Sequence, residues 1–269
     1  MKADNIFEKL WSQYTEKNPS VQKIHDLFIN EGEEVINDHI AFRTFNLPGV
    51  DIDTLAKPFL ETGYTYINSY DFETKKLNAK HFEHSKDPNA PRVFISELRV
   101  EEFSPFLQET VRSLVNSIPK EKIESNELIY SGRLWEKPSF DIYEKLRKES
   151  EYAAWLYVFG FCANHFTVSI NHLCQLDSIE KVNEFLKKNN FILNDSGGEI
   201  KGTPKDLLEQ SSIRAEHISV EFKEGVHNIP GCYYEFARRY KDERGIIYSG
   251  FIAKSADKIF ESTDQHNKE

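Results

Sequence analysis

Positive charge and long apolar segments are both scarce in this sequence of 269 residues. The chain carries 34 Lys and Arg against 44 Asp and Glu, a formal net charge of −10, so we expect neither nucleic acid nor an anionic membrane as a partner. Its least polar stretch, 152–163, is far shorter than the about 20 residues that a membrane-spanning helix needs. No apolar signal segment follows the first residues. These absences predict a cytoplasmic protein.

Cysteine and the familiar catalytic motifs are also scarce. The three cysteines, Cys162, Cys174 and Cys232, have no CxxC spacing, so we expect buried thiols instead of a disulfide framework or a thiolate zinc site. The sequence has no GxGxxG or Walker loop, no HExxH and no GxSxG. A catalytic site in this chain must therefore be assembled from residues that lie far apart in the sequence.

Hydrophobic periodicity predicts the same order of elements, a strand, a helix and three strands, twice along the chain. An offset of 126 residues places Asp38-His39 on Asn164-His165 and Asn68 on Asn194. Two such βαβββ units, placed side by side, can bury their open faces as one curved sheet around a cleft. We therefore expect one α+β domain made of N-terminal helices (1–36), a first unit (37–98), a helical linker (99–162), a second unit (163–240) and a C-terminal strand, helix and tail (241–269).

The later strands are expected at particular places. In the second unit the pattern predicts strands at 163–170, at 191–194 with 199–201, within 208–222 and at 232–240. The C-terminal part is expected to contain a strand at 246–252 and a helix at 255–261. A polar loop is expected to precede Pro138 in the linker.

Strand parity selects a set of metal ligands, because successive side chains of a strand point to opposite faces. His39 and His165 begin equivalent strands of the two units, and Glu235 lies on the last strand among apolar and aromatic neighbours. A lone buried carboxylate is costly unless it is paired or bound to a metal. Two histidines and one carboxylate form the facial triad of non-haem Fe(II), which leaves coordination positions open for substrate and dioxygen.

Arg43 is the candidate for substrate binding. It shares the face of His39 four residues further along, about 13 Å away at ~3.3 Å per residue, and could clamp the far carboxylate of a short diacid. Plainer interpretations stay open. Each histidine could be a hydrogen-bonded core residue, Arg43 could be a surface arginine, and Glu235 could simply pair with Arg238 or Arg239.

Other titratable residues are weaker candidates. Glu97 ends the last strand of the first unit, which makes it the rough counterpart of Glu235 and a rival or outer ligand. His81 and His84 lie in a lysine-rich stretch and are expected to be solvated. Core or surface roles are expected for the remaining candidates, His25, His172 and His217.

Five segments together resemble one known family. They are Asp-His-Ile-Ala-Phe-Arg-Thr (38–44), Pro-Arg-Val-Phe-Ile-Ser-Glu-Leu (91–98), Asn-His-Phe-Thr-Val-Ser-Ile-Asn (164–171), Gln-Ser-Ser (210–212) and Tyr-Tyr-Glu-Phe-Ala-Arg-Arg (233–239). Through them most of the chain resembles 2-oxoadipate dioxygenase/decarboxylase, also called hydroxyglutarate synthase, of the vicinal-oxygen-chelate superfamily. The resemblance implies an Fe(II) enzyme that converts 2-oxoadipate, from lysine degradation, and O2 to 2-hydroxyglutarate and CO2.

The resemblance also assigns roles to residues. The family's metal ligands fall on His39, His165 and Glu235 and its substrate clamp on Arg43, and Ser249 is a further expected substrate contact. Two other functions stay open. The same fold with Zn, Ni or Mn would serve a redox-neutral isomerase or hydrolase, and without a metal Arg43 and Arg239 would hold an anion in a binding module.

Overall fold

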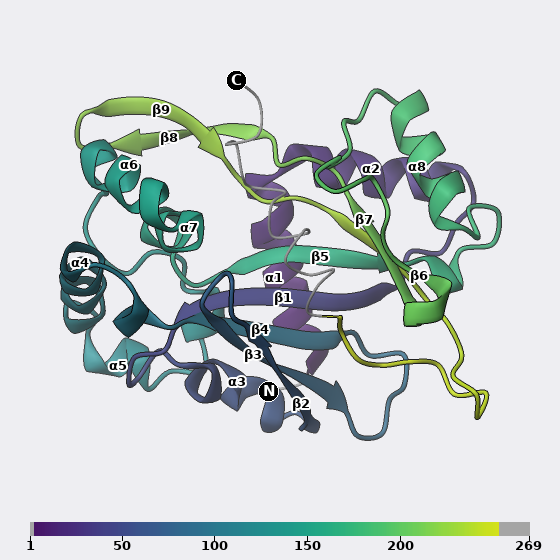
Figure 1. Ribbon diagram of the computed structural model, residues 1–269, viewed down its shortest axis with the longest axis horizontal. Coiled ribbons are helices and arrows are strands. Elements are labelled where there is room, and N and C mark those ends of the chain that lie inside the picture. The colour runs from purple at the N-terminus through teal and green to yellow at the C-terminus, as the bar shows by residue number, and fades with distance from the viewer. Residues whose placement is uncertain (1–2, 253–269) are drawn as a thin grey trace.

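A curved mixed sheet of eight strands, in the order β2-β3-β4-β1-β5-β10-β7-β6, forms the centre of the molecule (Figure 1). The computed structural model describes residues 3–252. The strands of this sheet are β1 (Asn37–Phe45), β2 (Tyr64–Phe72), β3 (Leu77–His84), β4 (Arg92–Leu98), β5 (Ala163–Ser169), β6 (Lys201–Thr203), β7 (Leu208–Ser212) and β10 (Glu235–Arg239).

The two halves of the sheet repeat the same pairing. In each half the first strand runs parallel to the last, β1 with β4 and β5 with β10. The inner strands β3 and β7 then pair antiparallel with β4 and β10, and β2 and β6 form the two edges. β1 and β5 pair antiparallel in the middle and join the halves. The expected α+β fold, with two βαβββ units in one curved sheet, is confirmed.

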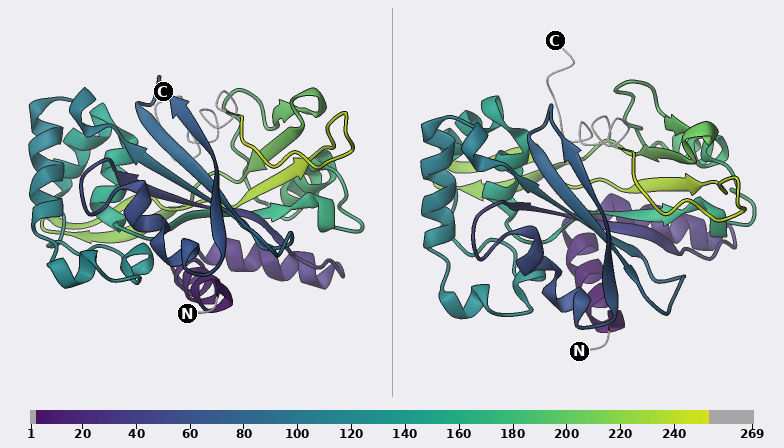
Figure 2. Two further views of the ribbon diagram at one scale, coloured as in Figure 1. Left: turned by 90° about the horizontal axis from the view of Figure 1, so that it is seen from below. Right: turned by 60° about the horizontal axis from the view of Figure 1, so that its bottom comes forward.

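Helices cover one side of this sheet. α1 (Ala3–Lys17) and α2 (Pro19–Asn30), drawn in purple, lie beneath it (Figure 2). Their apolar residues recur three or four positions apart, which gives each helix one face that packs into the core. The crossover helices α3 (Ile52–Leu60) and α8 (Ile179–Lys188) occupy equivalent places, and the side chains of Asp51 and Ser178 cap their N-termini.

The linker between the halves contains more structure than expected. Its helices are α4 (Pro105–Asn116), α5 (Lys120–Ile123), α6 (Phe140–Glu149) and α7 (Glu151–Phe159), with 3-10 turns η1 (Val100–Glu102) and η2 (Leu128–Tyr130). The prediction of a polar loop up to Pro138 is wrong, since α5 and η2 lie within it and η2 is buried. The apolar residues 152–159 of α7 are all buried, because α4, α6 and β1 surround this helix.

The second half departs from the expected strands. The strand expected within 208–222 is two strands, because β8 (His217–Phe222) leaves the sheet and pairs with β9 (Gly225–Pro230) as a separate hairpin. The physical reason is that β8 exposes one face, whereas β7 is buried on both. The hairpin packs on α6 through Phe222, which contacts Phe140 and Tyr143.

Two shorter strands are also absent from the described residues. The segment expected at 191–194 forms only an isolated bridge between Leu193 and Ile213, and the segment at 246–252 only a bridge between Lys241 and Ile247. η3 (Ile170–His172) and η4 (Pro204–Asp206) complete the described elements. The helix expected at 255–261 lies outside the described residues.

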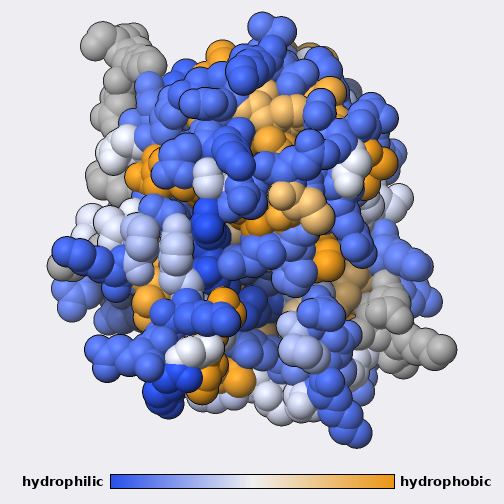
Figure 3. Space-filling model, turned by 90° about the vertical axis from the view of Figure 1, so that its right-hand side faces the viewer, coloured by the Kyte–Doolittle hydropathy of each residue, from blue (hydrophilic) through white to orange (hydrophobic). Residues whose placement is uncertain are grey.

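The surface and the cysteines agree only partly with expectation. Figure 3 shows a mostly hydrophilic face with small separate apolar areas, and among the described residues every helix is too short or too polar to cross a bilayer.

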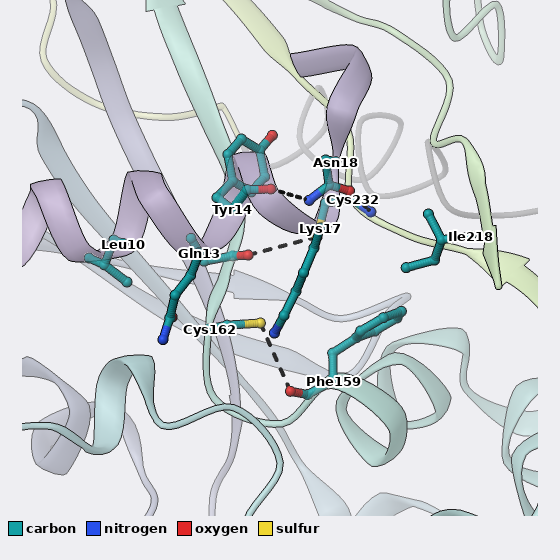
Figure 4. A pocket seen from close by; sticks show the side chains of 10 residues that line it. Leu10, Gln13, Tyr14, Lys17, Asn18, Phe159, Cys162, Ile218 and Cys232 are labelled. Carbon is teal, nitrogen blue, oxygen red and sulfur yellow. Dashed lines mark hydrogen bonds between the residues drawn. The ribbon is translucent and has the colours of Figure 1, made fainter. Parts of the chain in front are cut away.

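Cys162 and Cys232 are buried and line a small cavity beside α1 (Figure 4). Burial raises the pKa of both thiols, so they are not reactive thiolates. Cys174 is exposed, contrary to the prediction.

Candidate metal centre

The three ligand candidates selected from the sequence converge in the structure. His39 on β1, His165 on β5 and Glu235 on β10 come from three neighbouring strands. One ligand atom of each lies within 4.8 Å of the others, and all three residues are buried. In the part of the chain that the structure describes, no other group of His, Cys, Asp or Glu side chains meets this criterion. We refer to these three residues as the triad.

Both imidazoles of the triad turn their Nε2 atoms toward the carboxylate. His39 Nε2 lies 3.4 Å from Glu235 Oε1, and His165 Nε2 lies 3.3 Å from Glu235 Oε2. Gln210 donates a hydrogen bond to Oε1 at 2.5 Å, whereas Oε2 accepts none. A buried carboxylate oxygen without a hydrogen bond is costly, and a bound cation would remove that cost. The donor set therefore fits a divalent metal ion.

The residue before each histidine sets the orientation of its ring. His39 Nδ1 lies 2.8 Å from Asp38 Oδ1, and His165 Nδ1 lies 3.1 Å from Asn164 Oδ1. An oxygen acceptor at Nδ1 keeps the proton there and leaves the Nε2 lone pair available for a metal. The internal repeat thus duplicates both the ligand and the group that fixes its tautomer.

Asp38 is held in turn by arginine. Arg239 donates from Nε to Oδ2 at 2.7 Å and from Nη2 to Oδ1 at 2.9 Å. Burial acts to raise the pKa of Asp38, but Arg239 and hydrogen bonding hold that pKa well below its usual range. The alternative pairing of Glu235 with arginine is wrong, because Arg239 binds Asp38 and Arg238 stacks over Tyr240.

Burial changes the pKa values of all three triad residues. It raises the pKa of Glu235 to about 8, against the hydrogen bond from Gln210, which lowers it. It lowers the pKa of His39, and with the charges of His39 and Arg43 it lowers that of His165 well below its usual range. Both histidines are therefore neutral at pH 7, while the carboxyl group keeps its proton until a cation displaces it.

A proton and a metal ion compete for the carboxylate of Glu235. Metal binding should therefore become tighter as the pH rises toward about 8, the pKa of Glu235. Between pH 6.5 and 8 the Kd for Mn²⁺ should fall about tenfold per pH unit, because one proton leaves for each ion bound. Isothermal titration with Mn²⁺ across this range measures the slope. A Kd that does not change with pH would contradict the assignment of Glu235 as a ligand with a raised pKa.

Metal-free protein should show the opposite trend in stability. The folded pKa of Glu235, about 8, lies above its ordinary value of 4.5, so the folded state binds a proton that the unfolded state has lost. The free energy of unfolding should therefore fall as the pH rises from about 4.5 to about 8. The pKa values of His39 and His165 are lowered in the folded state, so these residues change the free energy of unfolding only below their ordinary pKa of 6.5. Of the three triad residues, only Glu235 therefore contributes to the slope between pH 6.5 and 8. Urea unfolding in EDTA measures this slope.

Arg43 is buried at one side of the triad. Its side chain is 2% exposed, and the guanidinium carbon lies 5.1 Å from the ring centres of both Tyr152 and Trp155. Tyr233 contacts both Arg43 and the triad, since its ring stacks on His165 at 4.7 Å and its hydroxyl interacts with Arg43. The surface alternative for Arg43 is therefore wrong. A guanidinium among aromatic rings is well suited to bind a carboxylate.

Glu97 is not the counterpart of Glu235. The registers pair Ala41 with Phe94 and Thr167 with Glu235, so the repeat matches Glu235 with Phe94. The prediction compared strand ends and was wrong by three positions, because pairing and not strand length fixes the register. Glu97 instead accepts hydrogen bonds from the backbone of Ile52, at 3.0 Å, and from Asn78, at 3.4 Å.

The other candidates lie away from the triad's ligand atoms. His81 is buried and lies 2.8 Å from the Tyr70 hydroxyl, so the prediction that it is solvated is wrong. The alternation of side chains along β3 could have predicted this burial, because His81 lies on the same face as the buried Leu77 and Ala79. Ser249 interacts with Glu83. His25 and His84 are partly buried, and His172 and His217 are exposed.

Two polar residues at the triad were not predicted. Gln210 donates to Glu235, and the Thr167 hydroxyl lies 3.1 Å from His39 Nε2. Thr167 shares the inward face of β5 with His165, so parity could have indicated it. Gln210 could be found only from the pairing of β7 with β10, which places it diagonally from Glu235.

Known proteins share this arrangement of the chain. Residues 6–242 match the family model of 2-oxoadipate dioxygenase/decarboxylase. The chain is 38% identical to the chloroplastic 2-oxoadipate dioxygenase/decarboxylase of Arabidopsis thaliana, over 98% of this chain and 79% of that protein. It is 35% identical, with a TM-score of 0.90, to the structure of hydroxyglutarate synthase from Oryza sativa in complex with 2-oxoadipate, covering 96% of this chain and 91% of the other. A structure from Shewanella frigidimarina, provisionally assigned as a hydrolase, is 50% identical with a TM-score of 0.88 and coverages of 93% and 97%.

Proposed function

The chain belongs to the 2-oxoadipate dioxygenase/decarboxylase family, and we propose that it is an Fe(II) enzyme that converts 2-oxoadipate and O2 to 2-hydroxyglutarate and CO2. The main support is the buried triad of His39, His165 and Glu235, with one carboxylate oxygen that lacks a hydrogen bond. Two imidazoles and one carboxylate are typical of non-haem Fe(II) oxygenases. A cytoplasmic location and a role in lysine degradation are part of the same proposal.

The triad and its neighbours would hold the ion in a fixed geometry. When bound, Fe(II) supplies the redox chemistry and the open coordination positions for the oxygenation. Asp38 and Asn164 keep the ring protons on Nδ1, so that both Nε2 atoms stay available as ligands. Gln210 fixes one oxygen of Glu235 and leaves the other turned toward His165.

Arg43 would bind the end of the substrate that does not react. 2-Oxoadipate has a carboxylate at each end, and a guanidinium can take one of them in a bidentate pair. The rings of Tyr152 and Trp155 exclude water from Arg43, which strengthens that pair. The 2-oxo acid end can then reach the metal centre. The separation between Arg43 and the triad would therefore select diacids of matching length. Ser249 remains a predicted substrate contact.

Oxygen uptake tests the proposed reaction. Protein loaded with Fe(II) without air and then mixed with 2-oxoadipate and O2 should consume one O2 and release one CO2 for each 2-hydroxyglutarate formed. No external reductant is needed, because substrate and O2 together contain all the atoms of the two products. Protein loaded with Zn²⁺ is the control and should consume no O2.

The same experiment separates the alternatives. Turnover of 2-oxoadipate without O2 would indicate a redox-neutral isomerase or hydrolase, and would overturn the proposal. Purified protein that holds no metal and gains no thermal stability from Fe(II) would indicate an anion-binding module.

A further inference from the structure

A short segment after β10 covers the metal centre. The chain turns back beyond Arg239, on the side of the sheet opposite the purple helices (Figure 2), and brings Phe251 edge-on to His39 with ring centroids 4.9 Å apart. Phe251 is 7% exposed and also packs on Phe94, at 4.7 Å, and His81, at 5.4 Å. We call residues 248–251 the cover.

Side chains hold the cover in place more than backbone pairing does. Arg239 Nη1 donates to the carbonyl oxygens of Tyr248, at 3.1 Å, and Gly250, at 2.7 Å. The backbone N–H of Phe251 donates to the Tyr70 hydroxyl at 3.1 Å. None of residues 248–251 belongs to a helix or strand. A segment held in this way opens at a lower free energy than a strand inside the sheet.

The guanidinium that holds the cover also holds a triad residue in position. Arg239 uses Nε and Nη2 to bind Asp38, whose Oδ1 faces His39 Nδ1 at 2.8 Å. The same guanidinium carbon lies 5.1 Å from the ring centre of Phe251. The planar group thus contacts Asp38 with one edge, the cover with another and Phe251 with its face. Lysine could not make these contacts together.

The two halves of the sheet differ at this point. The registers match Arg239 with Leu98 in the first half, and His165 is oriented by the neutral side chain of Asn164 instead of by a charged pair. In the part of the chain that the structure describes, Arg239 therefore links the His39 side of the metal centre, and not the His165 side, to the cover. The internal repeat alone does not require this link.

We propose that Arg239 is a positioning residue that couples the orientation of His39, through Asp38, to closure of the cover over the metal centre. The inference rests on the proposed function for its purpose, since closure would keep water from the bound 2-oxo acid. With the cover closed, Arg239 is fixed by two carbonyl oxygens and holds Asp38 in the geometry that suits metal binding. Because coupling is reciprocal, a metal at the triad favours the closed cover to the same degree that the closed cover favours metal binding.

Hydrogen exchange and metal titration test this coupling without the reaction. In the full-length protein without O2 or 2-oxoadipate, saturating Mn²⁺ should slow exchange in a peptide spanning 246–252 at least about fivefold, the lower end of typical coupling. Phe251→Ala, which removes the ring over His39, should weaken Mn²⁺ binding by the same factor. Its peptide should exchange fast with and without Mn²⁺.

Arg239→Lys should remove the contacts that connect Asp38 to the cover. It should weaken Mn²⁺ binding by about 10- to 100-fold, the usual cost of losing a partner of a metal ligand, and abolish the protection by Mn²⁺. Arg238→Gln is the matched control, since Arg238 stacks on Tyr240 and should leave both measurements unchanged. Tyr70→Phe, which removes the hydroxyl bound by Phe251 N, tests the cover even if Arg239→Lys does not fold.

Two results would overturn the coupling. The first is hydrogen exchange of the wild-type 246–252 peptide at the same rate with and without Mn²⁺. The second is a Phe251→Ala variant whose 246–252 peptide exchanges fast but whose Kd for Mn²⁺ equals that of the wild type. Neither depends on oxygen chemistry. A protein that fails to consume O2 but shows the coupled exchange would refute the proposed reaction and leave the coupling standing.

Discussion

Glu235→Gln should greatly weaken metal binding without destabilising the metal-free fold. The amide keeps the shape of the side chain but removes the charge, and loss of one partner from a buried charge interaction costs about 3–5 kcal/mol. The Kd for Mn²⁺ should therefore rise by about 10²- to 10⁴-fold, and oxygen-dependent turnover should fall at least as much. In EDTA at pH 7.5 the variant should be as stable as the wild type or more stable, because burial raises the pKa of Glu235 to about 8 and makes its ionisation costly.

Metal analysis, Mn²⁺ titration and urea unfolding in EDTA measure these opposite effects. Glu97→Gln is the matched control, because Glu97 is also an acid with a raised pKa but lies on β4, in the other half of the sheet, and contacts Ile52 and Asn78. It should keep the wild-type Kd. A Glu235→Gln variant that retains this Kd would exclude the carboxylate as a ligand.

Arg43→Met should impair use of the diacid and leave metal binding nearly unchanged. Methionine fills much of the space between Tyr152 and Trp155, so that the change removes the charge with little loss of packing. An unpartnered substrate carboxylate in a buried site costs about 3–5 kcal/mol, so kcat/KM for 2-oxoadipate should fall about 10²- to 10⁴-fold. The Kd for Mn²⁺ should stay within about threefold, because Arg43 is not a metal ligand.

2-Oxohexanoate, which lacks the second carboxylate, gives the decisive comparison for Arg43. The wild type should strongly prefer 2-oxoadipate, and Arg43→Met should lose most of that preference. Arg43→Lys keeps the charge but not the planar fork, and should recover only part of it. Equal loss of metal and of diacid selectivity in Arg43→Met would count against the clamp and assign Arg43 a structural role.

Local sequence patterns predicted much of the metal centre. Glu235 was indicated by its apolar neighbours on the last strand, which predict a buried carboxylate, and His39 and His165 were indicated by two features, alternation along strands and the repeat at 126 residues. Both can be recognised without coordinates, because a strand turns every second side chain to one face and a repeated unit places its equivalent residues alike. Alternation has a limit, because it does not reveal which sheet a strand joins. The hairpin of β8 and β9, whose first strand lies within the single strand expected at 208–222, was missed for that reason.

Register and burial separate the correct predictions from the wrong ones. Glu97 lies near the end of β4 whereas Glu235 begins β10, and the pairing of β1 with β4 and of β5 with β10 matches Glu235 with Phe94. His81 lies in a lysine-rich segment, but it is on the buried row of β3 and packs against Tyr70 and Phe251. Neither outcome follows from nearest neighbours in the sequence.

The sequence by itself determined the two repeated units of the sheet, the residue types of the triad and the face of each strand on which they lie. Only the tertiary structure decided that Arg239 binds Asp38, and that Phe251 lies over His39. It also set the pKa of Glu235 at about 8. The physical reason is that periodicity is a property of neighbouring residues, whereas desolvation and contacts between distant segments exist only after strand pairing and curvature have brought those segments together.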